Sequence, residues 1–461
     1  MRRVGVVGSG YVGTVVAACF ADIGHSVVAL EMDEQKVEAL SSGLLPFHEP
    51  ELGELLRSGL RSGNLRFTSH VDDAVAASDV IFLCVGTPSA PSGRPDLSAL
   101  EAALRGVARA ADAPKVLVTK STVPVGTGNW VASVVDDEMA RRDDPPVPFS
   151  VVSNPEFLRE GLAVHDFLNP DRVVVGSDDP EALDTVASLY APILDGATVR
   201  DDSDHPVLLR TALCAAEMIK YASNAFLATK ISFANEIANI CERVGADVGD
   251  VTQAIGLDTR IGSKFLDAGV GWGGSCFGKD LSALVTTAHE LGYDATLLDA
   301  AVTVNRQQRT QVVEKLQRHL GALLGRRVAL LGLAFKPGTD DIRDAPAVEI
   351  ARLLLEVGAS VRAHDPVVRA IPGLPGLVID ADPYVAASRA DAVVLVTEWP
   401  EYQVMDLDRL RDTMRGDLFV DGRNAFTPAH LRGAGFRPVS FGRLDHRAPV
   451  ERRSSMSGSQ G

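Results

Sequence analysis

The segment at residues 271–280 holds the side chains best suited to covalent chemistry. It reads Gly-Trp-Gly-Gly-Ser-Cys-Phe-Gly-Lys-Asp, and its glycines let the backbone approach a ligand closely. If a helix begins at Phe277, Cys276 lies at its N-terminus, where a thiolate is favoured, and Lys279 adds positive charge. Asp280 follows as a candidate base. A lone cysteine is more often a small buried apolar residue, but its neighbours here favour a nucleophile that forms a covalent adduct.

Two pairs of polar side chains are spaced to act together. Lys220 and Asn224 are four residues apart on a predicted helix, so both leave the same face. An ammonium and an amide N–H aimed at one point can stabilise a developing oxyanion, with a solvated surface pair as the alternative. Glu156 and Glu160 share that spacing beyond a predicted strand, and one of them could shuttle a proton or position water with Thr122. The sequence does not divide these roles among the carboxylates.

A glycine-rich turn at residues 8–13 predicts a dinucleotide site. It reads Gly-Ser-Gly-Tyr-Val-Gly, follows the apolar run 4–7 and opens a helical pattern. Gly8 permits the tight turn, Gly10 lets the backbone approach a pyrophosphate, and Gly13 lets helix and strand pack closely. The phosphates then lie at a helix N-terminus, where unpaired N–H groups favour anions. The expected contacts are Gly8, Gly10, Tyr11, Val12 and Gly13.

Other residues are placed to contact the rest of the cofactor. Glu31 ends the second predicted strand, where a carboxylate accepts hydrogen bonds from ribose hydroxyls and repels a 2′-phosphate. This favours NAD over NADP, and the nearby Lys36 is included among the expected cofactor-binding residues. Thr87 and Thr122 each follow a strand at positions expected to face the cofactor, with plain turn residues as the alternative.

These side chains require strands that end at one edge and helices that begin there. Short β-branched runs alternate with helical patterns in the first half of the chain, which predicts a parallel sheet covered on both faces. The βα alternation resumes at residue 326. The predicted strands are residues 4–7, 26–30, 80–85, 116–119, 151–152, 172–176, 328–331, 360–363, 393–396 and 418–420.

A long helical pattern separates the two βα regions. Apolar residues recur at helical spacing from 207 to 245, about 38 residues, which corresponds to a helix of about 57 Å. A helix of that length bridges domains or forms a subunit interface, so we expect a homodimer. A second helical pattern covers residues 295–320.

The expected fold class is α/β, with two Rossmann-like doubly wound domains joined by a long central helix and a helical dimerisation domain. At 461 residues the chain exceeds what one hydrophobic core supports. The predicted boundaries are an NAD-binding domain at 1–206, a central helical domain at 207–320 and a second α/β domain at 321–446. The polar, Ser/Gly-rich tail at 447–461 is predicted to be disordered.

Composition narrows the class of protein. A net charge of −16 argues against a nucleic-acid partner, because phosphate backbones require a basic surface. The five cysteines are scattered without CxxC pairs, so we expect no disulfide framework, no metal site and a reducing compartment, the cytoplasm. Glycines interrupt the N-terminal apolar run, which argues against a signal peptide. No apolar run of about 20 residues is present, so no membrane span is expected.

Several motifs in one order resemble the UDP-glucose/GDP-mannose dehydrogenase family, over nearly the whole chain up to about residue 440. Their number makes the resemblance far more specific than any single motif. Trp272 stands where Phe or Tyr is expected, and Glu31 where Asp is commoner, and both keep the chemical character. The motifs are residues 8–13, 86–88 (Gly-Thr-Pro), 120–127 (Lys-Ser-Thr-Val-Pro-Val-Gly-Thr), 154–161 (Asn-Pro-Glu-Phe-Leu-Arg-Glu-Gly), 220–228 (Lys-Tyr-Ala-Ser-Asn-Ala-Phe-Leu-Ala), 271–280 and 335–343 (Phe-Lys-Pro-Gly-Thr-Asp-Asp-Ile-Arg).

The resemblance implies NAD-dependent four-electron oxidation of UDP-glucose at C6, through a thiohemiacetal and then a thioester on Cys276. It implies that the domain at 321–446 binds the UDP-sugar, that Lys336 meets the substrate and that Arg343 meets NAD. Arg260 resembles a residue lent across the dimer, with a local ion pair as the alternative.

The expected site residues fall into three groups. The catalytic group is Cys276, Lys220, Asp280, Asn224, Thr122, Glu156 and Glu160. The cofactor-binding group is Gly8, Gly10, Tyr11, Val12, Gly13, Glu31, Lys36, Thr87, Thr122, Glu160, Lys279 and Arg343. The substrate-binding group is Phe157, Leu158, Arg159, Glu160, Lys220, Asn224, Arg260, Phe265, Leu266, Asp267, Ala268, Gly269, Gly273 and Lys336.

Three other functions are weighed against this one. A sister enzyme of the family would act on GDP-mannose or UDP-N-acetylmannosamine instead. A simple hydroxyacid dehydrogenase with the same N-terminal turn would have no use for a cysteine among glycines. A non-catalytic NAD-binding scaffold would be signalled by the loss of Cys276, Lys220 or Asp280, and all three are present.

Overall fold

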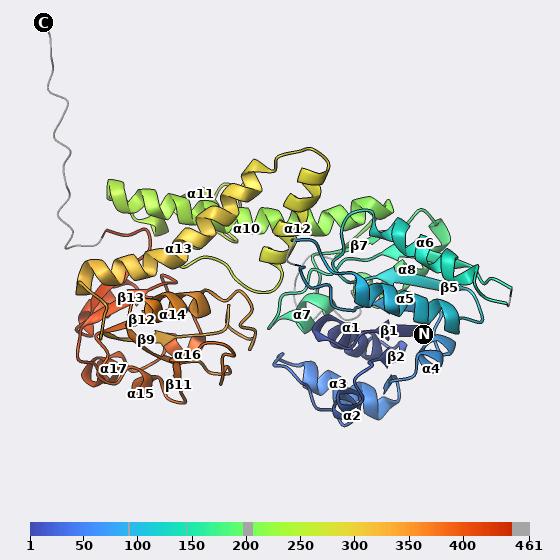
Figure 1. Cartoon of the computed structure of the whole chain (residues 1–461), viewed down its shortest axis with the longest axis horizontal. Helices are drawn as coiled ribbons and strands as arrows, with labels where there is room; N and C mark the ends of the chain where they lie inside the picture. Colours follow the sequence, from blue (N-terminus) through green and yellow to red (C-terminus); the bar gives the residue numbers. More distant parts are fainter. Residues whose placement is uncertain (91–92, 144, 197–205, 445–461) are drawn as a thin grey trace, which may run out of the picture. The chain divides into compact units, whose positions relative to one another are not determined.

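The computed structural model describes residues 1–90, 93–143, 145–196 and 206–444 (Figure 1). The predicted tail at 447–461 lies outside the described residues. By its internal contacts the chain divides into two compact units, each assembled from three stretches of chain. The first unit comprises Met1–Thr229, Gly273–Val302 and Ala334–Ala345, and the second comprises Lys230–Trp272, Thr303–Leu333 and the chain from Pro346.

An eight-stranded sheet forms the centre of the first unit, in the order β3-β2-β1-β4-β5-β6-β7-β8. Neighbouring strands run parallel except β6 and β7, which meet antiparallel at Ser153 and Gly176, so β7 and β8 run against the rest. The prediction that 172–176 joins a parallel sheet is therefore wrong, because an antiparallel neighbour needs no full helical crossover. The strands are β1 Arg3–Val7, β2 Ser26–Leu30, β3 Leu65–Thr68, β4 Val80–Leu83, β5 Lys115–Thr119, β6 Phe149–Ser153, β7 Arg172–Gly176 and β8 Val207–Thr211.

Apolar side chains leave both faces of this sheet and pack under helices. Val4 and Val6 of β1 join one core and Val7 joins the other, as the alternation of a strand requires. In the first core the Phe20 ring lies 5.0 Å from the Phe82 ring and 5.1 Å from the Phe167 ring. The helices of this unit are α1 Tyr11–Asp22, α2 Glu34–Ser41, α3 Leu52–Ser62, α4 Val71–Ala76, α5 Ser98–Ala110, α6 Thr127–Met139, α7 Ala163–Leu168, α8 Pro180–Leu189, α9 Ala191–Leu194 and α12 Phe277–Glu290.

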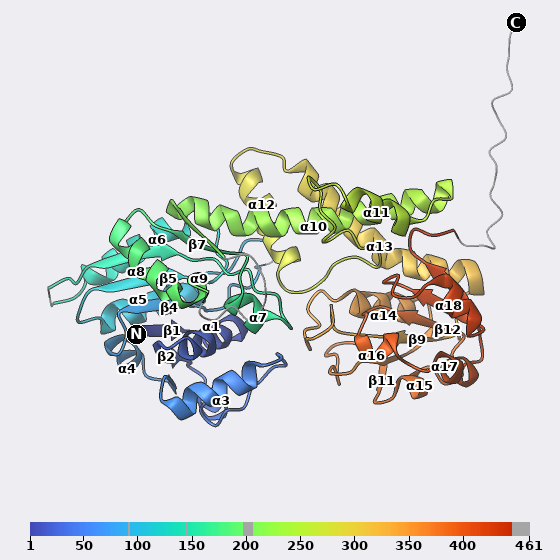
Figure 2. The ribbon, with the colours of Figure 1, turned by 180° about the vertical axis from the view of Figure 1, so that it is seen from behind.

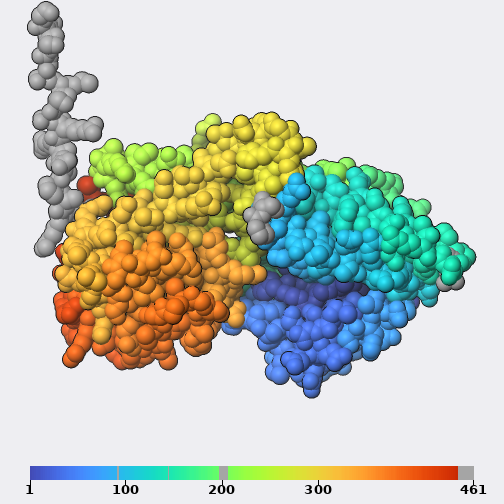
Figure 3. Space-filling view, viewed as in Figure 1, coloured from blue at the N-terminus to red at the C-terminus, as the bar shows by residue number. Residues whose placement is uncertain are grey.

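Helix α12 lies on the surface of the first unit although it is distant in sequence from the sheet. The space-filling view shows its yellow surface against the light-blue surface of the N-terminal half (Figure 3). An ion pair joins the two segments, with 2.5 Å between Arg94 and Glu290. The segment with the cysteine is therefore carried by the same unit as the glycine turn.

The long helix α10 spans Leu213–Val244, 32 residues in all (Figure 2). The predicted start at residue 207 is wrong, because Val207–Thr211 forms β8 and satisfies its backbone against β7. Helix α13, at Thr296–Leu320, agrees with the second predicted helical pattern. Among the described residues, no helix has the length and apolar character needed to cross a membrane.

The second unit is built on a six-stranded parallel sheet in the order β11-β10-β9-β12-β13-β14. The structure confirms the α/β class with two doubly wound sheets and a long central helix; β3, β8, β11 and β14 are strands that the sequence did not predict. The strands are β9 Arg327–Leu331, β10 Ser360–His364, β11 Val378–Asp380, β12 Ala392–Leu395, β13 Leu418–Asp421 and β14 Arg437–Ser440. The helices include α11 Val248–Gly256, α14 Pro346–Glu356, α15 Pro383–Ala386, α16 Pro400–Gln403, α17 Leu407–Thr413 and α18 Pro428–Gly433.

The strand order of the first sheet determines where a ligand can bind. Strand β1 has β2 on one side and β4 on the other, so the crossovers diverge there and open a crevice at the carboxyl ends of the strands. The segments that leave this edge hold expected site residues, namely Gly8, Glu31, Thr87, Thr122 and Glu156.

The packing of α1 on β1 predicts opposite effects at two glycines. A Cβ added at Gly13 would lie 1.8 Å from the Gly8 carbonyl oxygen, whereas one added at Gly10 would meet no atom within 4 Å. Gly13→Ala is therefore expected to lower the free energy of unfolding by about 3 kcal/mol or more, and Gly10→Ala by less than about 1 kcal/mol. Thermal unfolding followed by circular dichroism measures both. Equal stability of the two variants would contradict this packing.

Candidate active site

The glycine turn has the shape that a bound dinucleotide requires. Gly8 adopts φ 94°, a backbone conformation that favours glycine, and Gly13 brings α1 against the turn. Gly10 caps α1, and the open space beside it leaves room for a pyrophosphate at the helix N-terminus. Tyr11 and Val12 begin the helix. The turn therefore fits NAD.

The acid expected at the ribose lies directly after β2. The Glu31 side chain is mostly buried, and its Oε1 accepts a hydrogen bond of 3.2 Å from the Asp33 N–H. The Lys36 Nζ lies 3.9 Å from Glu31 Oε2, so this cation faces the carboxylate that was expected to exclude NADP. Elsewhere at the same edge, the Thr87 hydroxyl donates to the Thr122 carbonyl over 2.8 Å and ties two of the loops together.

Cys276 lies immediately before α12, as expected for a cysteine at a helix N-terminus. The Asp280 N–H donates to its carbonyl oxygen over 2.8 Å, which closes the first turn of the helix. The Sγ lies 3.6 Å from the hydroxyl of Ser275. Behind the cysteine, Gly274 adopts φ 90°, and a Cβ there would lie 2.8 Å from the Phe335 ring. The turn before the cysteine therefore requires glycine.

A buried ion pair links α10 to the loop after β6. The Lys220 Nζ donates to Glu156 Oε1 over 2.7 Å, and Glu156 Oε2 accepts the Leu158 N–H over 2.7 Å. Burial opposes the ionised form of Glu156, but Lys220 and the Leu158 N–H outweigh it and lower the pKa of that carboxyl. Burial likewise opposes the charge on Lys220, but Glu156 and the neighbouring Cys276 and Asp280 raise its pKa. Both partners are therefore held in their charged forms.

The second residue of the predicted pair on α10 also finds an acidic partner. The Asn224 Nδ2 donates to Asp280 Oδ2 over 2.6 Å, and both side chains are buried. Asp280 Oδ1 lies 2.9 Å from the Lys279 Nζ. Because an amide nitrogen carries two hydrogens, Asn224 keeps one more N–H for a ligand.

The thiol itself is less acidic than the sequence predicted. Burial raises the pKa of Cys276, the Glu156 carboxylate raises it further, and Lys220 only partly offsets them. This direction runs against the expectation that the helix N-terminus and Lys279 favour a thiolate, because burial and a nearby carboxylate both favour the neutral thiol.

Glu160 sits in a cluster of weak polar contacts rather than in one strong pair. Its carboxylate lies 3.5 Å from the Ser275 hydroxyl, 3.5 Å from the Thr339 hydroxyl and 3.4 Å from Arg343. Burial raises the pKa of Glu160 to about 7, and the carboxylate of Asp341 adds to the shift. Burial lowers the pKa of Lys336, which lies in the loop that also carries Thr339 and Asp341.

Other predicted residues are held by local partners. The exposed Arg159 forms an ion pair of 2.6 Å with Asp166, and the Arg172 guanidinium lies 4.0 Å from the centre of the Phe157 ring. Leu158 donates its N–H to Glu156, and Gly273 is buried. In the second unit Arg260 pairs with Asp258 over 2.6 Å, and its side chain is 86% exposed.

The predicted substrate loop at residues 265–269 lies in the second unit. Phe265 adopts φ 65°, which strains a non-glycine residue, while Leu266 and Ala268 are buried and Asp267 is exposed. A Cβ added at Gly269 would lie 2.3 Å from the Gly422 carbonyl, so the loop requires glycine there. The structure thus holds this loop firmly within its own unit.

Three polar residues of the first unit were not predicted as site residues. The buried Lys120 Nζ donates to Asn154 Oδ1 over 2.9 Å, and burial lowers the pKa of this lysine to about 8. Both residues lie inside recognised motifs, but only the pairing of β5 with β6 shows that they meet. The third, Glu49, is a buried carboxylate in a loop, and no spacing in the sequence marked it.

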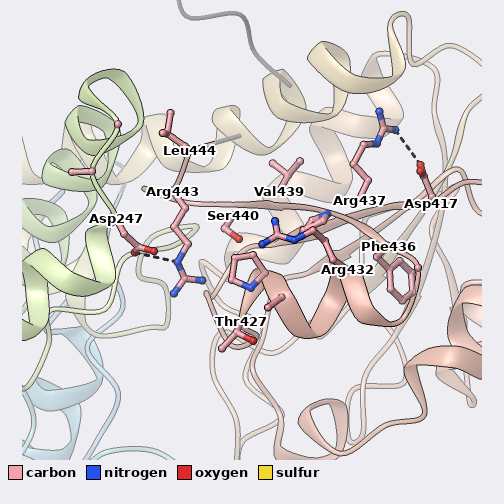
Figure 4. A pocket seen from close by; sticks show the side chains of 16 residues that line it. Asp247, Asp417, Thr427, Arg432, Phe436, Arg437, Val439, Ser440, Arg443 and Leu444 are labelled. Carbon is pink, nitrogen blue, oxygen red and sulfur yellow. Dashed lines mark hydrogen bonds and ion pairs between the residues drawn. The ribbon is translucent and has the colours of Figure 1, made fainter. Parts of the chain in front are cut away.

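A hollow of about 620 Å³ lies in the second unit between the end of α10 and the segment from 427 to 444 (Figure 4). Arg443 pairs with Asp247 over 3.2 Å, and Arg437 pairs with Asp417 over 3.2 Å. Among the described residues, none of those predicted for the site lines it. The hollow is therefore separate from the chemistry of the first unit.

Comparison with known proteins gives matches over nearly the whole chain. Models of the UDP-glucose/GDP-mannose dehydrogenase family match as the NAD binding domain at residues 2–194, the central domain at 214–307 and the UDP binding domain at 329–428. UDP-glucose 6-dehydrogenase of Bacillus subtilis is 44% identical over 448 residues, covering 96% of this chain and 94% of that protein. The enzyme of that name from Rhizobium meliloti is 46% identical, covering 96% and 100%. A solved UDP-glucose dehydrogenase from Pyrobaculum islandicum has a TM-score of 0.84 at 42% identity, covering 92% of this chain and 95% of that chain.

The opposing charges around Cys276 predict opposite changes in its reactivity. Removing the carboxylate in Glu156→Gln lowers the pKa of the thiol, and removing the ammonium in Lys220→Met raises it. At pH 8 iodoacetamide should therefore label Cys276 roughly threefold to tenfold faster in the first variant and slower in the second. The exposed Cys214 is first changed to Ser, while the remaining cysteines are buried. Rates that change in the opposite order would show that these charges do not control the thiol.

Proposed function

The chain belongs to the UDP-glucose/GDP-mannose dehydrogenase family, and we propose that it oxidises the C6 alcohol of UDP-glucose to the carboxylate of UDP-glucuronate. One observation carries the assignment: Cys276 lies immediately before α12, beside two buried polar pairs, Lys220 with Glu156 and Asn224 with Asp280. A dehydrogenase that stops at a ketone or an aldehyde has no use for such a nucleophile. Relatives spanning the full chain carry the name of this reaction.

The cofactor is NAD, in agreement with the NAD binding domain of the family. The turn from Gly8 to Gly13 would hold the pyrophosphate, and Glu31 would accept hydrogen bonds from the ribose hydroxyls. Thr87, Thr122, Lys279 and Arg343 are assigned to the remaining cofactor contacts. When bound, NAD accepts one hydride from the substrate carbon in each of two oxidations.

Cys276 makes the second oxidation possible. The first oxidation removes a hydride from C6 and a proton from its hydroxyl, which leaves an aldehyde. The Cys276 sulfur adds to the carbonyl carbon and forms a thiohemiacetal, from which loss of the second hydride and of the hydroxyl proton leaves a thioester. Water then adds, the carbon–sulfur bond breaks, and the carboxylate leaves while the thiol is restored.

Lys220 and Asn224 stabilise the oxygen that becomes negative in these steps. Each has one N–H committed to a carboxylate, Glu156 or Asp280, which leaves two N–H donors on Lys220 and one on Asn224 for the substrate. The carboxylates orient the donors before the substrate arrives, so no reorganisation is needed during the reaction. A donor of this kind contributes roughly 3–4 kcal/mol to the transition state in other enzymes.

The three acidic residues have different surroundings, and we assign each a different part in the proton transfers. Glu156 is held ionised by Lys220, which suits a base that positions water together with Thr122. Glu160, with a pKa of about 7, can carry a proton at neutral pH. Asp280 orients Asn224 and is the base nearest to the cysteine in the chain.

The UDP-sugar contacts are assigned within the first unit to Lys336, to the segment 157–160 and to Gly273. The UDP binding domain of the family, matched at 329–428, supports a site of this kind. Arg260, exposed on its own subunit, is assigned to the site of a second subunit.

A homodimer completes this assignment. Phe226, Phe233 and Ile240 recur every seven residues along α10 and are 66%, 49% and 48% exposed. An apolar stripe on a long helix fits the same stripe of a second copy, which would cover both. A cytoplasmic location agrees with five free cysteines, of which Cys276 must stay reduced to react.

The stoichiometry of the reaction tests the proposed function. With excess NAD and limiting UDP-glucose, the protein should release two NADH per sugar, and Cys276→Ala should show no sustained turnover. One NADH per sugar, or an active Cys276→Ala, would rule out the thioester route. If UDP-glucose yields none, GDP-mannose and UDP-N-acetylmannosamine are tried under the same conditions, and turnover of either would replace the substrate assignment.

The apolar stripe on α10 predicts the oligomeric state. Light scattering should give twice the chain mass of 48.9 kDa for the wild type and a lower mass for Phe233→Asp, because a carboxylate cannot be buried against the apolar partner helix. Val404→Asp, at a side chain that is 85% exposed elsewhere, is the matched control and should keep the wild-type mass. A monomeric wild type would remove the dimer and the role given to Arg260.

A further inference from the structure

We infer that Glu49 is a positioning residue, whose carboxylate fastens the glycine turn to the loop that carries Glu156 and Glu160. Its kinetic consequence rests on the proposed function, whereas its structural consequence does not. Glu49 lies between α2 and α3, far in sequence from both segments, and its side chain is buried.

Three donors converge on this carboxylate. Glu49 Oε2 accepts the Gly161 N–H over 2.6 Å, and Oε1 accepts the Ala163 N–H over 2.8 Å. The Tyr11 hydroxyl makes a short hydrogen bond to Oε2 and lies 3.2 Å from the Gly161 nitrogen. Tyr11 is the first residue of α1, so one end of this contact is the dinucleotide turn and the other is the end of the loop after β6.

The donors around position 49 require a carboxylate, and an uncharged amide cannot replace it. Ala163 begins α7, whose N-cap Leu162 makes no side-chain hydrogen bond to the helix, so Glu49 satisfies the first N–H from outside. An ionised carboxylate has only acceptors and can receive all three donors. A glutamine would turn its NH₂ group toward an N–H or O–H donor, and at least one buried donor would lose its partner.

The same junction reaches the loop after β9. Gly161 adopts φ 81°, and a Cβ there would lie 2.8 Å from the Gly338 carbonyl oxygen. The His48 N–H, next to Glu49 in the chain, donates to Asp340 Oδ1 over 3.4 Å. Thr339 of this loop contacts Glu160, so Glu49 and its neighbour act on both loops around that carboxylate.

This arrangement explains how Glu160 is placed by contacts that are individually weak. Its side chain makes long hydrogen bonds of 3.4 and 3.5 Å to Ser275, Thr339 and Arg343, and its contact with Asp341 brings together two carboxyl groups. The backbone immediately after it is fixed instead, through the short bonds of Gly161 and Ala163 to Glu49. Glu49 therefore acts on the reaction through Glu160 without touching the substrate.

Hydrogen exchange of the protein without ligands tests the structural consequence. Glu49→Gln should speed exchange about tenfold or more in peptides containing Gly161 and Ala163, and in peptides from the loop at 336–341. Glu54→Gln is the matched control, since Glu54 lies on the same segment with an exposed side chain. Tyr11→Phe removes one donor only, should give the same pattern more weakly, and serves as the test if Glu49→Gln fails to fold.

Kinetics test the functional consequence with the same variants. Glu49→Gln should lower kcat about tenfold or more, Glu54→Gln should leave it unchanged, and the double variant with Tyr11→Phe should be no slower than Glu49→Gln alone. Faster exchange spread evenly over both units would overturn the inference, because it would make Glu49 a general stabilising residue. Unchanged exchange, or local exchange with unchanged kcat, would also overturn it. If the wild type produces no NADH from any of the three sugar nucleotides, the proposed function fails. The exchange result alone then decides whether Glu49 holds the two segments together.

Discussion

The buried pair between Lys220 and Glu156 is the constraint on which the candidate active site depends. Neither charge is tolerable alone in that environment, and removing one partner of such a pair typically costs about 3–5 kcal/mol. The pair joins α10 to the loop after β6, and so fixes the helix that also carries Asn224. In the proposed reaction, the charge that stabilises the oxyanion therefore comes from a group that the fold itself must keep protonated.

Similar groups acquire different properties from their surroundings here. Glu156 and Glu160 are four residues apart, yet Lys220 lowers the pKa of one while burial and Asp341 raise that of the other. The two carboxyls are thereby separated into an ionised group and a group that titrates near neutrality, which is how one site can supply both a base and an acid. The raised pKa of Cys276 belongs to the same balance, since its thiol faces the carboxylate that Lys220 holds ionised.

Local patterns predicted the parts of the molecule that local chemistry determines. The turn at residues 8–13, the helix start after Cys276 and most strands of both sheets follow from glycine positions and β-branched runs. The antiparallel β7, the strand β8 and the role of Glu49 depend on partners far along the chain, so no spacing could reveal them. The raised pKa of the Cys276 thiol has the same origin, because burial and the carboxylate of Glu156 come from the fold rather than from the motif.

The junction before α10 limits the number of residues between β8 and the helix. Strand β8 ends at Thr211 and α10 begins at Leu213, so a single residue connects a strand held by the sheet to a helix held by its buried charge. One inserted residue would turn the helix by about 100° and carry Lys220 and Asn224 away from their acidic partners. Homologous proteins that keep this chemistry should therefore preserve the number of residues from β8 to Lys220. They should tolerate insertions in the loops at the other edge of the sheet, away from the candidate active site.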